Sequence, residues 1–480
     1  MHSLCYDSIF SVNATVTMRG LKIFLVLLGF LLFAVPSSNG ESSSCLRAYE
    51  EGGAAAVFES PECPYWHLSS FQRNTLNCQF STLQGRRRYQ EDRVSCDLDL
   101  QIPFPGRTGI KNITAGMVAI FDGHNGAEAS DMASKLLLEY FILHTYFLLH
   151  GTYSSELKST GDPLALDMER SSYMEILKES LRRTIHDIDA TFSKANLYIY
   201  IYIYISFFLF VEASRNNLFS GSTATVALIV DGQIIVANVG DSKALLCSKG
   251  MLSLQEAKVE DYGDFKLEAS NGSTHFSARE LTRDHHPDRD DERSRVEAAG
   301  GFVVEWAGAA RVNGELAVSR AIGDMPYKRY GVISTPEMTD WQPPTGNDSY
   351  LVAASDGIFH KLTTQDVCDL LWYVHTRGNE KSELSASCSH SLADCIVNTA
   401  FEEGSTDNLS AVVVPLRSTG FSGALFKERF DGEGSIDSSA FGLQKIISSQ
   451  SGNLPYSLDS RYNIQALVDI VCVPTLIRES

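Results

Sequence analysis

The sequence predicts an α+β fold in which two central antiparallel β-sheets are sandwiched between helices. Short apolar runs of strand length alternate with stretches of helical periodicity, and two of the runs are joined by an Asp231-Gly232 turn typical of a hairpin. With 480 residues, of which 44% are hydrophobic and 21% charged, the chain is long enough for one large domain with extensions.

Five apolar runs are predicted to be strands because they are rich in strand-forming residues and adjoin turn-forming ones. They are residues 117–121, 223–230, 234–239, 350–354 and 409–416. The second and third form the hairpin, and each of the others adjoins an acidic motif.

Three segments are predicted to be helices. In one, apolar residues recur at steps of three and four: Met174, Leu177, Leu181, Ile185, Ile188 and Phe192. A second is expected over residues 127–150. A third begins at Thr363, where Asp366 completes a pattern similar to a capping box, and continues through Leu371.

Four short acidic motifs carry the functional signal: Gln90-Glu91-Asp92, Asp122-Gly123-His124-Asn125-Gly126, Ser355-Asp356-Gly357 and Asp407-Asn408. A single Asp-Gly pair is usually a plain turn. Here, however, three of the motifs adjoin predicted strands, so their carboxylates can share one cleft. Converging carboxylates are the ligands that hard divalent cations prefer, which suggests a two-metal hydrolase.

Eight segments, in this order, resemble the metal-dependent protein serine/threonine phosphatases of type 2C. They are GRRRYQED (85–92), VAIFDGH (118–124), SGSTA (220–224), ANVGDS (237–242), LTRDH (281–285), LAVSRAIGD (316–324), ASDG (354–357) and TDN (406–408). The resemblance covers residues 80 to 416 and is to plant members with an N-terminal hydrophobic segment. It implies the same helix-covered pair of sheets, with the metals at one edge.

This resemblance implies two Mg²⁺ or Mn²⁺ ions per site. Asp122 would bridge them, the carbonyl of Gly123 would bind one, and Asp356 with Asp407 would bind the other. A bridging water would attack phosphorus in line, without a covalent enzyme intermediate. His124 would then protonate the leaving serine or threonine oxygen.

The other expected site residues would bind the substrate phosphate, or would contact the metals only through water or through the ligands. Arg87 would hold the substrate phosphate through its planar fork of donors, although a basic run of this kind is usually a solvated surface. Five residues are expected to act through bound water or behind the ligands: Glu91, Asp92, Thr223, Asp241 and Asn408. Thr223 and Asp241 could equally be strand and turn residues, and a third metal at Asp241 is left open.

Two positions depart from the family pattern. Asn125 replaces a glycine, and because asparagine tolerates unusual backbone angles, the turn is expected to be kept. His360 replaces the acidic residue that helps to hold a third metal, which puts that third site in doubt but not the main pair.

The net charge of −19 argues against a nucleic-acid or anionic-membrane binding surface. The expected partner is a phosphoprotein substrate, and the chain is expected to be a monomer.

The N-terminal 40 residues are interpreted as an extension followed by a secretory signal peptide or a signal anchor. Arg19 and Lys22 precede the apolar run 23–35, which is short for a membrane-spanning helix. A further region, 41–79, leads into a catalytic domain over 80–417, and 418–480 is a Ser/Gly-rich, linker-like tail. Either a lumenal enzyme or a membrane-anchored one with a cytosolic catalytic domain fits this pattern.

Residues 197–211 form an anomalous apolar insertion with Tyr-Ile alternation. A transmembrane helix here would separate Asp122 from Asp356, and an exposed strand would be prone to aggregation. We interpret the segment as the trace of a retained intron or of a faulty gene model.

Ten cysteines leave the compartment open. Cys45, Cys63 and Cys78 could pair in an oxidising lumen, whereas those of the catalytic span could equally be buried thiols.

The expected function is metal-dependent hydrolysis of phosphoserine and phosphothreonine in proteins. The alternative is a catalytically impaired, membrane-tethered binding or regulatory module, disabled by the insertion at 197–211.

Overall fold

The computed structural model describes residues 44–60, 63, 79–106, 109–160, 170–205, 219–251, 274–377 and 391–416. One five-stranded sheet contains β1 (Gln79–Leu83), β8 (Lys243–Met251), β9 (Thr274–Glu280), β14 (Asp348–Ala354) and β15 (Leu409–Pro415). The other contains β2 (Arg93–Gly106), β3 (Gly109–Phe121), β6 (Ala224–Val230), β7 (Gln233–Val239) and β13 (Glu337–Met338). Their orders are β1-β15-β14-β8-β9 and β13-β7-β6-β3-β2, with every pair antiparallel.

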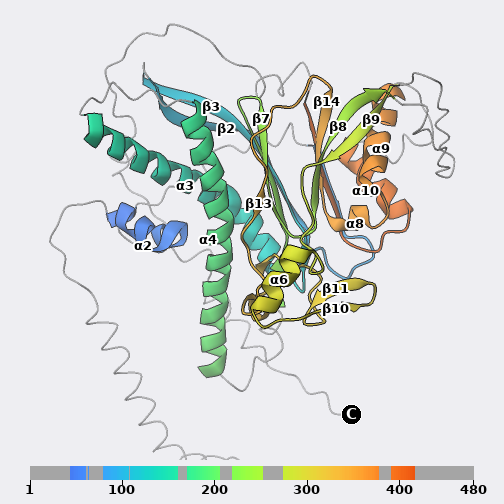
Figure 1. Cartoon of the computed structure of the whole chain (residues 1–480), viewed down its shortest axis with the longest axis horizontal. Helices are drawn as coiled ribbons and strands as arrows, with labels where there is room; N and C mark the ends of the chain where they lie inside the picture. The colour runs from blue at the N-terminus through green and yellow to red at the C-terminus, as the bar shows by residue number, and fades with distance from the viewer. Residues whose placement is uncertain are drawn as a thin grey trace, which may run out of the picture.

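Helices cover the outer faces of both sheets (Figure 1). The longer described helices are α2 (Ser44–Glu59), α3 (Glu128–Thr160), α4 (Arg170–Ile205), α6 (Asp290–Ala298), α9 (Thr364–Arg377) and α10 (Leu392–Glu402). Helices α3 and α4 pack on the β2/β3 sheet, and α9 and α10 pack on the other. The predicted α+β sandwich is therefore confirmed.

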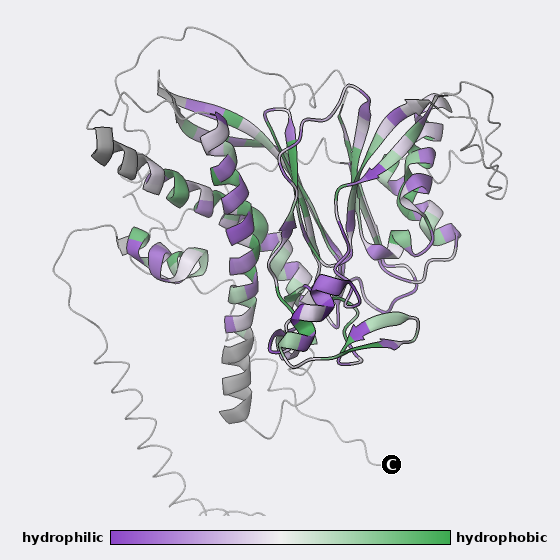
Figure 2. Ribbon diagram, in the orientation of Figure 1, coloured by the Kyte–Doolittle hydropathy of each residue, from purple (hydrophilic) through white to green (hydrophobic). Residues whose placement is uncertain are grey.

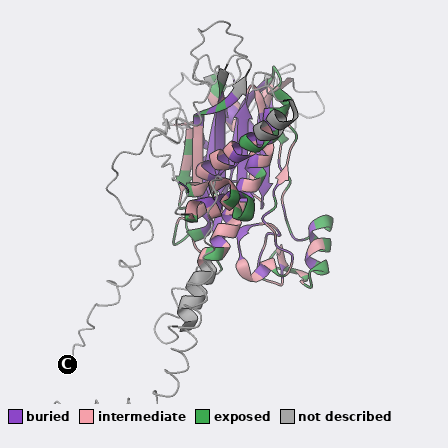
Figure 3. Cartoon of the chain, turned by 90° about the vertical axis from the view of Figure 1, so that its left-hand side faces the viewer, coloured by how far each residue is buried: buried purple, intermediate pink, exposed green. Residues whose placement is uncertain are grey.

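The strands are apolar on both faces because each sheet is covered on both sides. In β3, Val118 and Ile120 point toward the other sheet, whereas Met117 and Phe121 point toward the helices. This alternation follows from the two-residue period of a strand. Figure 2 shows these strands largely in green, as apolar, and Figure 3 shows them largely in purple, as buried.

The predicted helices are confirmed, and one of them has the predicted cap. All six periodic apolar residues of α4 are buried. At the start of α9, the backbone N–H of Thr363 donates to Asp366 over 2.7 Å, and the N–H of Asp366 donates to the hydroxyl of Thr363 over 3.1 Å. These reciprocal bonds form a capping box, in which the residue at the third helical position is Asp instead of the usual Glu or Gln.

Smaller elements complete the fold at the end of the sandwich where the acidic motifs lie. They are β4 (Gly123–His124), β5 (Gly221–Ser222), β12 (Ile322–Gly323), the hairpin of β10 (Val303–Trp306) and β11 (Ala309–Val312), and the short helices α7 (Met325–Lys328) and α8 (Asp356–Phe359). Strands β4, β5 and β12 form a separate three-stranded sheet.

The region before the catalytic span packs on it through α2. The hydroxyl of Tyr49 and Nδ1 of His144, which lies on α3, are 2.8 Å apart and buried. The backbone N–H of Ala54 donates to Asp187 of α4 over 2.7 Å. These contacts join α2 to both α3 and α4, so part of region 41–79 belongs to the folded body.

Part of the apolar insertion continues a helix. Residues 197–205 belong to α4, and 206–211 lie outside the described residues, as does the predicted signal segment. Among the described residues, one stretch, Glu128–Thr152 of α3, is long and apolar enough to cross a membrane. Half of its most apolar window is buried, and core helices of globular domains meet the same criterion.

Candidate active site

Three acidic motifs meet at one end of the sandwich because the strands that carry them are neighbours. Strand β14 ends at Ala354, which pairs with Ala411 near the start of β15, so Asp356 and Asp407 lie on adjacent strand ends. Ligand atoms of Asp356, His360 and Asp407 all lie within 4.8 Å of one another. The residue that departs from the family pattern, His360, therefore lies beside two expected metal ligands.

Asp122 follows β3 and interacts with the same cluster. Burial raises its pKa well above the ordinary value, and the carboxylates of Asp92 and Asp356 raise it further. Burial also raises the pKa of Asp92 and of Asp241 to about 7, and Asp356 adds to both shifts. The structure thus brings Asp92, Asp122, Asp241 and Asp356 close enough together for their charges to interact.

The loop after Asp122 is held by backbone and hydroxyl contacts. The backbone N–H of Asp122 donates to the Thr223 hydroxyl over 3.0 Å, and the N–H of Thr223 donates back to the carbonyl of Asp122 over 2.9 Å. A Cβ on Gly123 would lie 2.4 Å from the carbonyl oxygen of Glu91, so only glycine fits there. Asn125 has φ of 57°, as expected for the residue that replaces a glycine.

Glu91 and Asn408 tie the first motif to the last. The backbone N–H of Glu91 donates to the side-chain oxygen of Asn408 over 2.8 Å, and the Glu91 carboxylate accepts the N–H of Gly126 over 2.8 Å. The amide nitrogen of Asn408 donates to the carbonyls of Gln84 and Tyr89. The buried side chain of Asn408 thus joins the segment 84–91 to the start of β15.

Arg87 lies at the mouth of the cluster, where its Nη2 donates to Oδ2 of Asp407 over 2.6 Å. The arginine side chain is 58% exposed. Exposed ion pairs of this kind contribute little to stability.

His124 has a partner that the sequence analysis missed. Its Nε2 lies 2.7 Å from Oδ2 of Asp324, a fully buried residue 200 positions away. Although burial lowers it, the Asp324 carboxylate raises the pKa of His124 above the ordinary value. Asp324 ends the recognised LAVSRAIGD segment, and its acidic side chain directly after a glycine was the available signal.

The donor set fits divalent cations. Asp92 is 2% exposed, and within the described part of the chain neither of its carboxylate oxygens has a hydrogen-bond partner of normal geometry. The nearby hydroxyls of Ser410 and Ser355 only partly offset the effect of burial on its pKa. Clustered carboxylates that raise one another's pKa are stabilised by a bound metal or its water.

Comparisons with known proteins agree with this site. The family model described as protein phosphatase 2C matches residues 206–409. "Probable protein phosphatase 2C 51" of Arabidopsis thaliana is 49% identical over 450 residues, covering 82% of each chain. The chain belongs to the protein phosphatase 2C family. "Putative protein phosphatase 2C 76" of Oryza sativa subsp. japonica is 45% identical, with 93% of this chain and 98% of that protein covered.

A solved serine-threonine phosphatase 2C from Toxoplasma gondii aligns with 70% of this chain and 94% of its own, at 20% identity and a TM-score of 0.49. The family assignment depends on the curated relatives, and it makes this chain a protein serine/threonine phosphatase. The recognised resemblance to type 2C phosphatases is therefore confirmed.

This protein phosphatase 2C has a cavity of about 220 Å³ beside the loop that follows Asp122. It is lined by Asn125 of that loop and by Phe219, Glu315, Leu316 and Tyr327. The sequence alone could not locate this cavity.

Proposed function

We propose that the chain hydrolyses phosphoserine and phosphothreonine esters in proteins with two Mg²⁺ or Mn²⁺ ions per site. The observation that carries this proposal is the convergence of Asp122, Asp356 and Asp407 at one end of the sandwich, with buried Asp92 behind them. When bound, the ions would supply an activated water and neutralise the phosphoryl oxygens.

The residues have distinct roles in this proposal. Asp122 would be a ligand of both ions, the carbonyl of Gly123 would bind one of them, and Asp356 with Asp407 would bind the other. Thr223, Glu91 and Asn408 fix these ligands through the hydrogen bonds described above. His360 and Asp241 border the same cluster, so either could contribute to a third ion site.

Metal binding tests the ligand set. Calorimetric titration of the metal-free protein with Mn²⁺ is expected to give two ions per chain, and Asp356→Asn is expected to weaken at least one of them by more than tenfold. Binding of no ion, or unchanged binding in the variant, would contradict the assignment.

Arg87 holds the substrate phosphate in this proposal. Because lysine offers a point charge where arginine offers a planar fork, Arg87→Lys is expected to raise KM for a phosphothreonine peptide by about tenfold and to change kcat much less. Steady-state kinetics checks this, with the exposed neighbour Arg88→Lys as the matched control. A fall in kcat at constant KM would assign Arg87 to another step.

The alternative of a catalytically impaired binding module is not favoured. The expected ligands are all present, and the curated relatives that the chain resembles are named as phosphatases.

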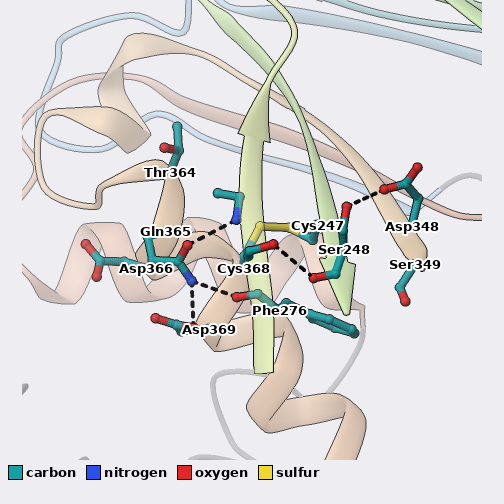
Figure 4. The surroundings of a disulfide bond; sticks show 12 residues. Cys247, Ser248, Phe276, Asp348, Ser349, Thr364, Gln365, Asp366, Cys368 and Asp369 are labelled. Atoms are coloured by element: carbon teal, nitrogen blue, oxygen red, sulfur yellow. Dashed lines mark hydrogen bonds between the residues drawn. A yellow bond between two sulfur atoms is a disulfide. The ribbon is translucent and has the colours of Figure 1, made fainter. Parts of the chain in front are cut away.

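We propose that the catalytic domain matures in an oxidising lumen. Cys247 of β8 and Cys368 of α9 form a disulfide, and both residues are fully buried (Figure 4). Cys45 and Cys63 form another disulfide. Cys96 is also disulfide-bonded, and so is Cys395. Several disulfides in one domain are typical of secreted and lumenal proteins. They are consistent with a signal peptide within the N-terminal 40 residues, and they favour a lumenal enzyme over a membrane-anchored one with a cytosolic catalytic domain.

Removal of the Cys247–Cys368 bond is expected to lower the free energy of unfolding by about 2 to 4 kcal/mol. Its ends are 121 residues apart, so it constrains the unfolded chain strongly. Denaturant unfolding of Cys247→Ala/Cys368→Ala measures this.

Cys45→Ala/Cys63→Ala is the matched control. The Cys45–Cys63 bond closes a loop of 18 residues, whereas the Cys247–Cys368 bond closes one of 121. The loop-closure contribution to stability grows as (3/2)RT times the logarithm of loop length, so removal of the shorter loop is expected to cost about 1.7 kcal/mol less. Free thiols at Cys247 and Cys368 in protein purified from its native compartment would contradict the proposal.

A further inference from the structure

The three-stranded sheet of β4, β5 and β12 brings one histidine and one aspartate together across a glycine. His124 pairs with Gly221, and Gly221 pairs with Gly323, which directly precedes Asp324. A Cβ on Gly221 would lie 2.2 Å from Oδ2 of Asp324 and 2.3 Å from Nε2 of His124. The glycine therefore leaves the space in which the two side chains meet.

The backbone around Asp324 is held in a conformation that few residues adopt. Asp324 has φ of 51° and ψ of 43°, in the left-handed region, and its N–H donates to the carbonyl of Ser220 over 3.0 Å. Strained backbone of this kind persists only where the surroundings fix it, and it is concentrated at functional sites.

Helix α4 provides that support from outside the sheet. Oδ1 of Asp189 accepts the N–H of Gly323 over 2.8 Å, and Oδ2 accepts from Lys328 over 2.9 Å. Lys328 also donates to the carbonyl of Ala321 over 2.7 Å. The turn that carries Asp324 is thus held at both ends.

The hydrogen bond assigns the two ring nitrogens of His124. A carboxylate only accepts, so Nε2 carries the hydrogen of the 2.7 Å bond to Asp324. Within the described residues Nδ1 has no hydrogen-bond partner, and the His124 side chain is 27% exposed. Nδ1 is therefore the nitrogen left to face a substrate.

We propose that Asp324 is a positioning residue that holds His124 so that Nδ1 donates a proton to the leaving oxygen. In the step, the oxygen of water bonds to phosphorus, the bond between phosphorus and the serine or threonine oxygen breaks, and that oxygen takes the Nδ1 proton. The released phosphate keeps both protons of the water, and solvent then returns a proton to Nδ1. The inference rests on the proposed function and adds to it the residue that orients the proton donor.

Leaving-group dependence tests the proposal. Asp324→Asn suits the left-handed backbone and is expected to lower kcat for a phosphothreonine peptide by about 10- to 100-fold. Its kcat for p-nitrophenyl phosphate is expected to stay within about threefold, because nitrophenolate leaves without protonation. An equal loss on both substrates would overturn the inference, since it would indicate a structural role.

A double-mutant cycle gives a second measure. If Asp324 acts through His124, adding Asp324→Asn to His124→Gln is expected to cause no further loss on the phosphopeptide. A further loss equal to that of the single variant would contradict the proposal. If Asp324→Asn does not fold, Asp189→Asn can replace it, because Asp189 holds the same turn. This variant is expected to lose activity on the phosphopeptide and not on p-nitrophenyl phosphate, with a smaller effect than Asp324→Asn. An equal loss on both substrates would overturn the proposal.

The metal-free protein offers a readout that does not depend on turnover. Heteronuclear NMR of the histidine ring nitrogens is expected to show a hydrogen-bonded Nε2–H for His124 that is lost in Asp324→Asn. Failure of wild-type protein to hydrolyse either substrate with Mn²⁺ would count against the proposed function alone. Hydrolysis of both substrates by the wild type, with an unchanged His124 Nε2–H signal in Asp324→Asn, would count against this inference alone.

Discussion

Asp122→Asn is expected to lower Mn²⁺-dependent phosphate release from a phosphothreonine peptide by more than about 100-fold. Loss of a residue behind a metal ligand typically costs 10- to 100-fold, and Asp122 is proposed as a direct ligand to both ions. Steady-state kinetics at saturating Mn²⁺ measures the effect. Asp99→Asn, an exposed change on the adjoining strand β2, is the matched control.

The same substitution is expected to stabilise the metal-free protein. Asp122 is half-buried beside the carboxylates of Asp92, Asp356 and Asp241, and an amide cannot add a charge that repels them. Thermal unfolding in the presence of a chelator should therefore give a higher Tm for the variant, while added Mn²⁺ should raise the Tm of the wild type more. A variant that is less stable without metal, and equally active with it, would contradict the role of Asp122.

Glu292→Gln is expected to lower the free energy of unfolding by about 3 to 5 kcal/mol, the usual result of breaking a buried ion pair on one side. Glu292 of α6 is fully buried and accepts hydrogen bonds from Arg295 over 2.8 Å and from Arg320 over 2.7 Å. The hydroxyl of Ser319 also donates to it. Arg289 also contacts Glu292, over 3.3 Å, but it has Asp291 and Glu337 as further partners, so the substitution would chiefly leave Arg295 and Arg320 without their shared anion.

This prediction has a defined pH dependence. Despite the opposing effect of burial, Arg295 and Arg320 hold the pKa of Glu292 well below its ordinary value of 4.5. A carboxyl group with a depressed folded-state pKa contributes stability above its unfolded pKa and loses that contribution as the pH falls toward the folded one. The difference between wild type and Glu292→Gln should thus be constant from neutral pH to about pH 5 and shrink below pH 4.5.

Denaturant unfolding across this pH range measures the difference, with the exposed Glu297→Gln on the same helix as control. A Glu292→Gln protein as stable as the control would show that the arginine cluster tolerates the loss of its anion.

The sandwich, and the strand ends that carry most of the proposed metal ligands, could be predicted because they depend on local patterns. Apolar runs of strand length marked β3, β6, β7, β14 and β15, and three of the four acidic motifs adjoined one of them. Asn125 adopts positive φ because its side chain is among the few that tolerate it, and sequence alone indicated this.

The contacts that complete the site could not be predicted because they join distant segments. Nothing local indicates that Asp324 meets His124 across Gly221, or that Arg87 bonds to Asp407 over 320 positions. The pairing of distant strands, β4 with β5 and β12 in one case and β1 with β15 in the other, brings each of these pairs of side chains together. The Tyr-Ile alternation indicated no secondary structure for residues 197–205, which continue α4 because a helix propagates easily once begun.

The central claim is that these clustered carboxylates make a metal-dependent phosphatase, and phosphate release from a phosphothreonine peptide tests it most directly. The full chain is expected to release phosphate with Mn²⁺ and not with a chelator, and both Asp122→Ala and Asp356→Ala are expected to abolish release. Release that persists in the chelator or in both variants, or no release by the wild type with Mn²⁺, would contradict the account.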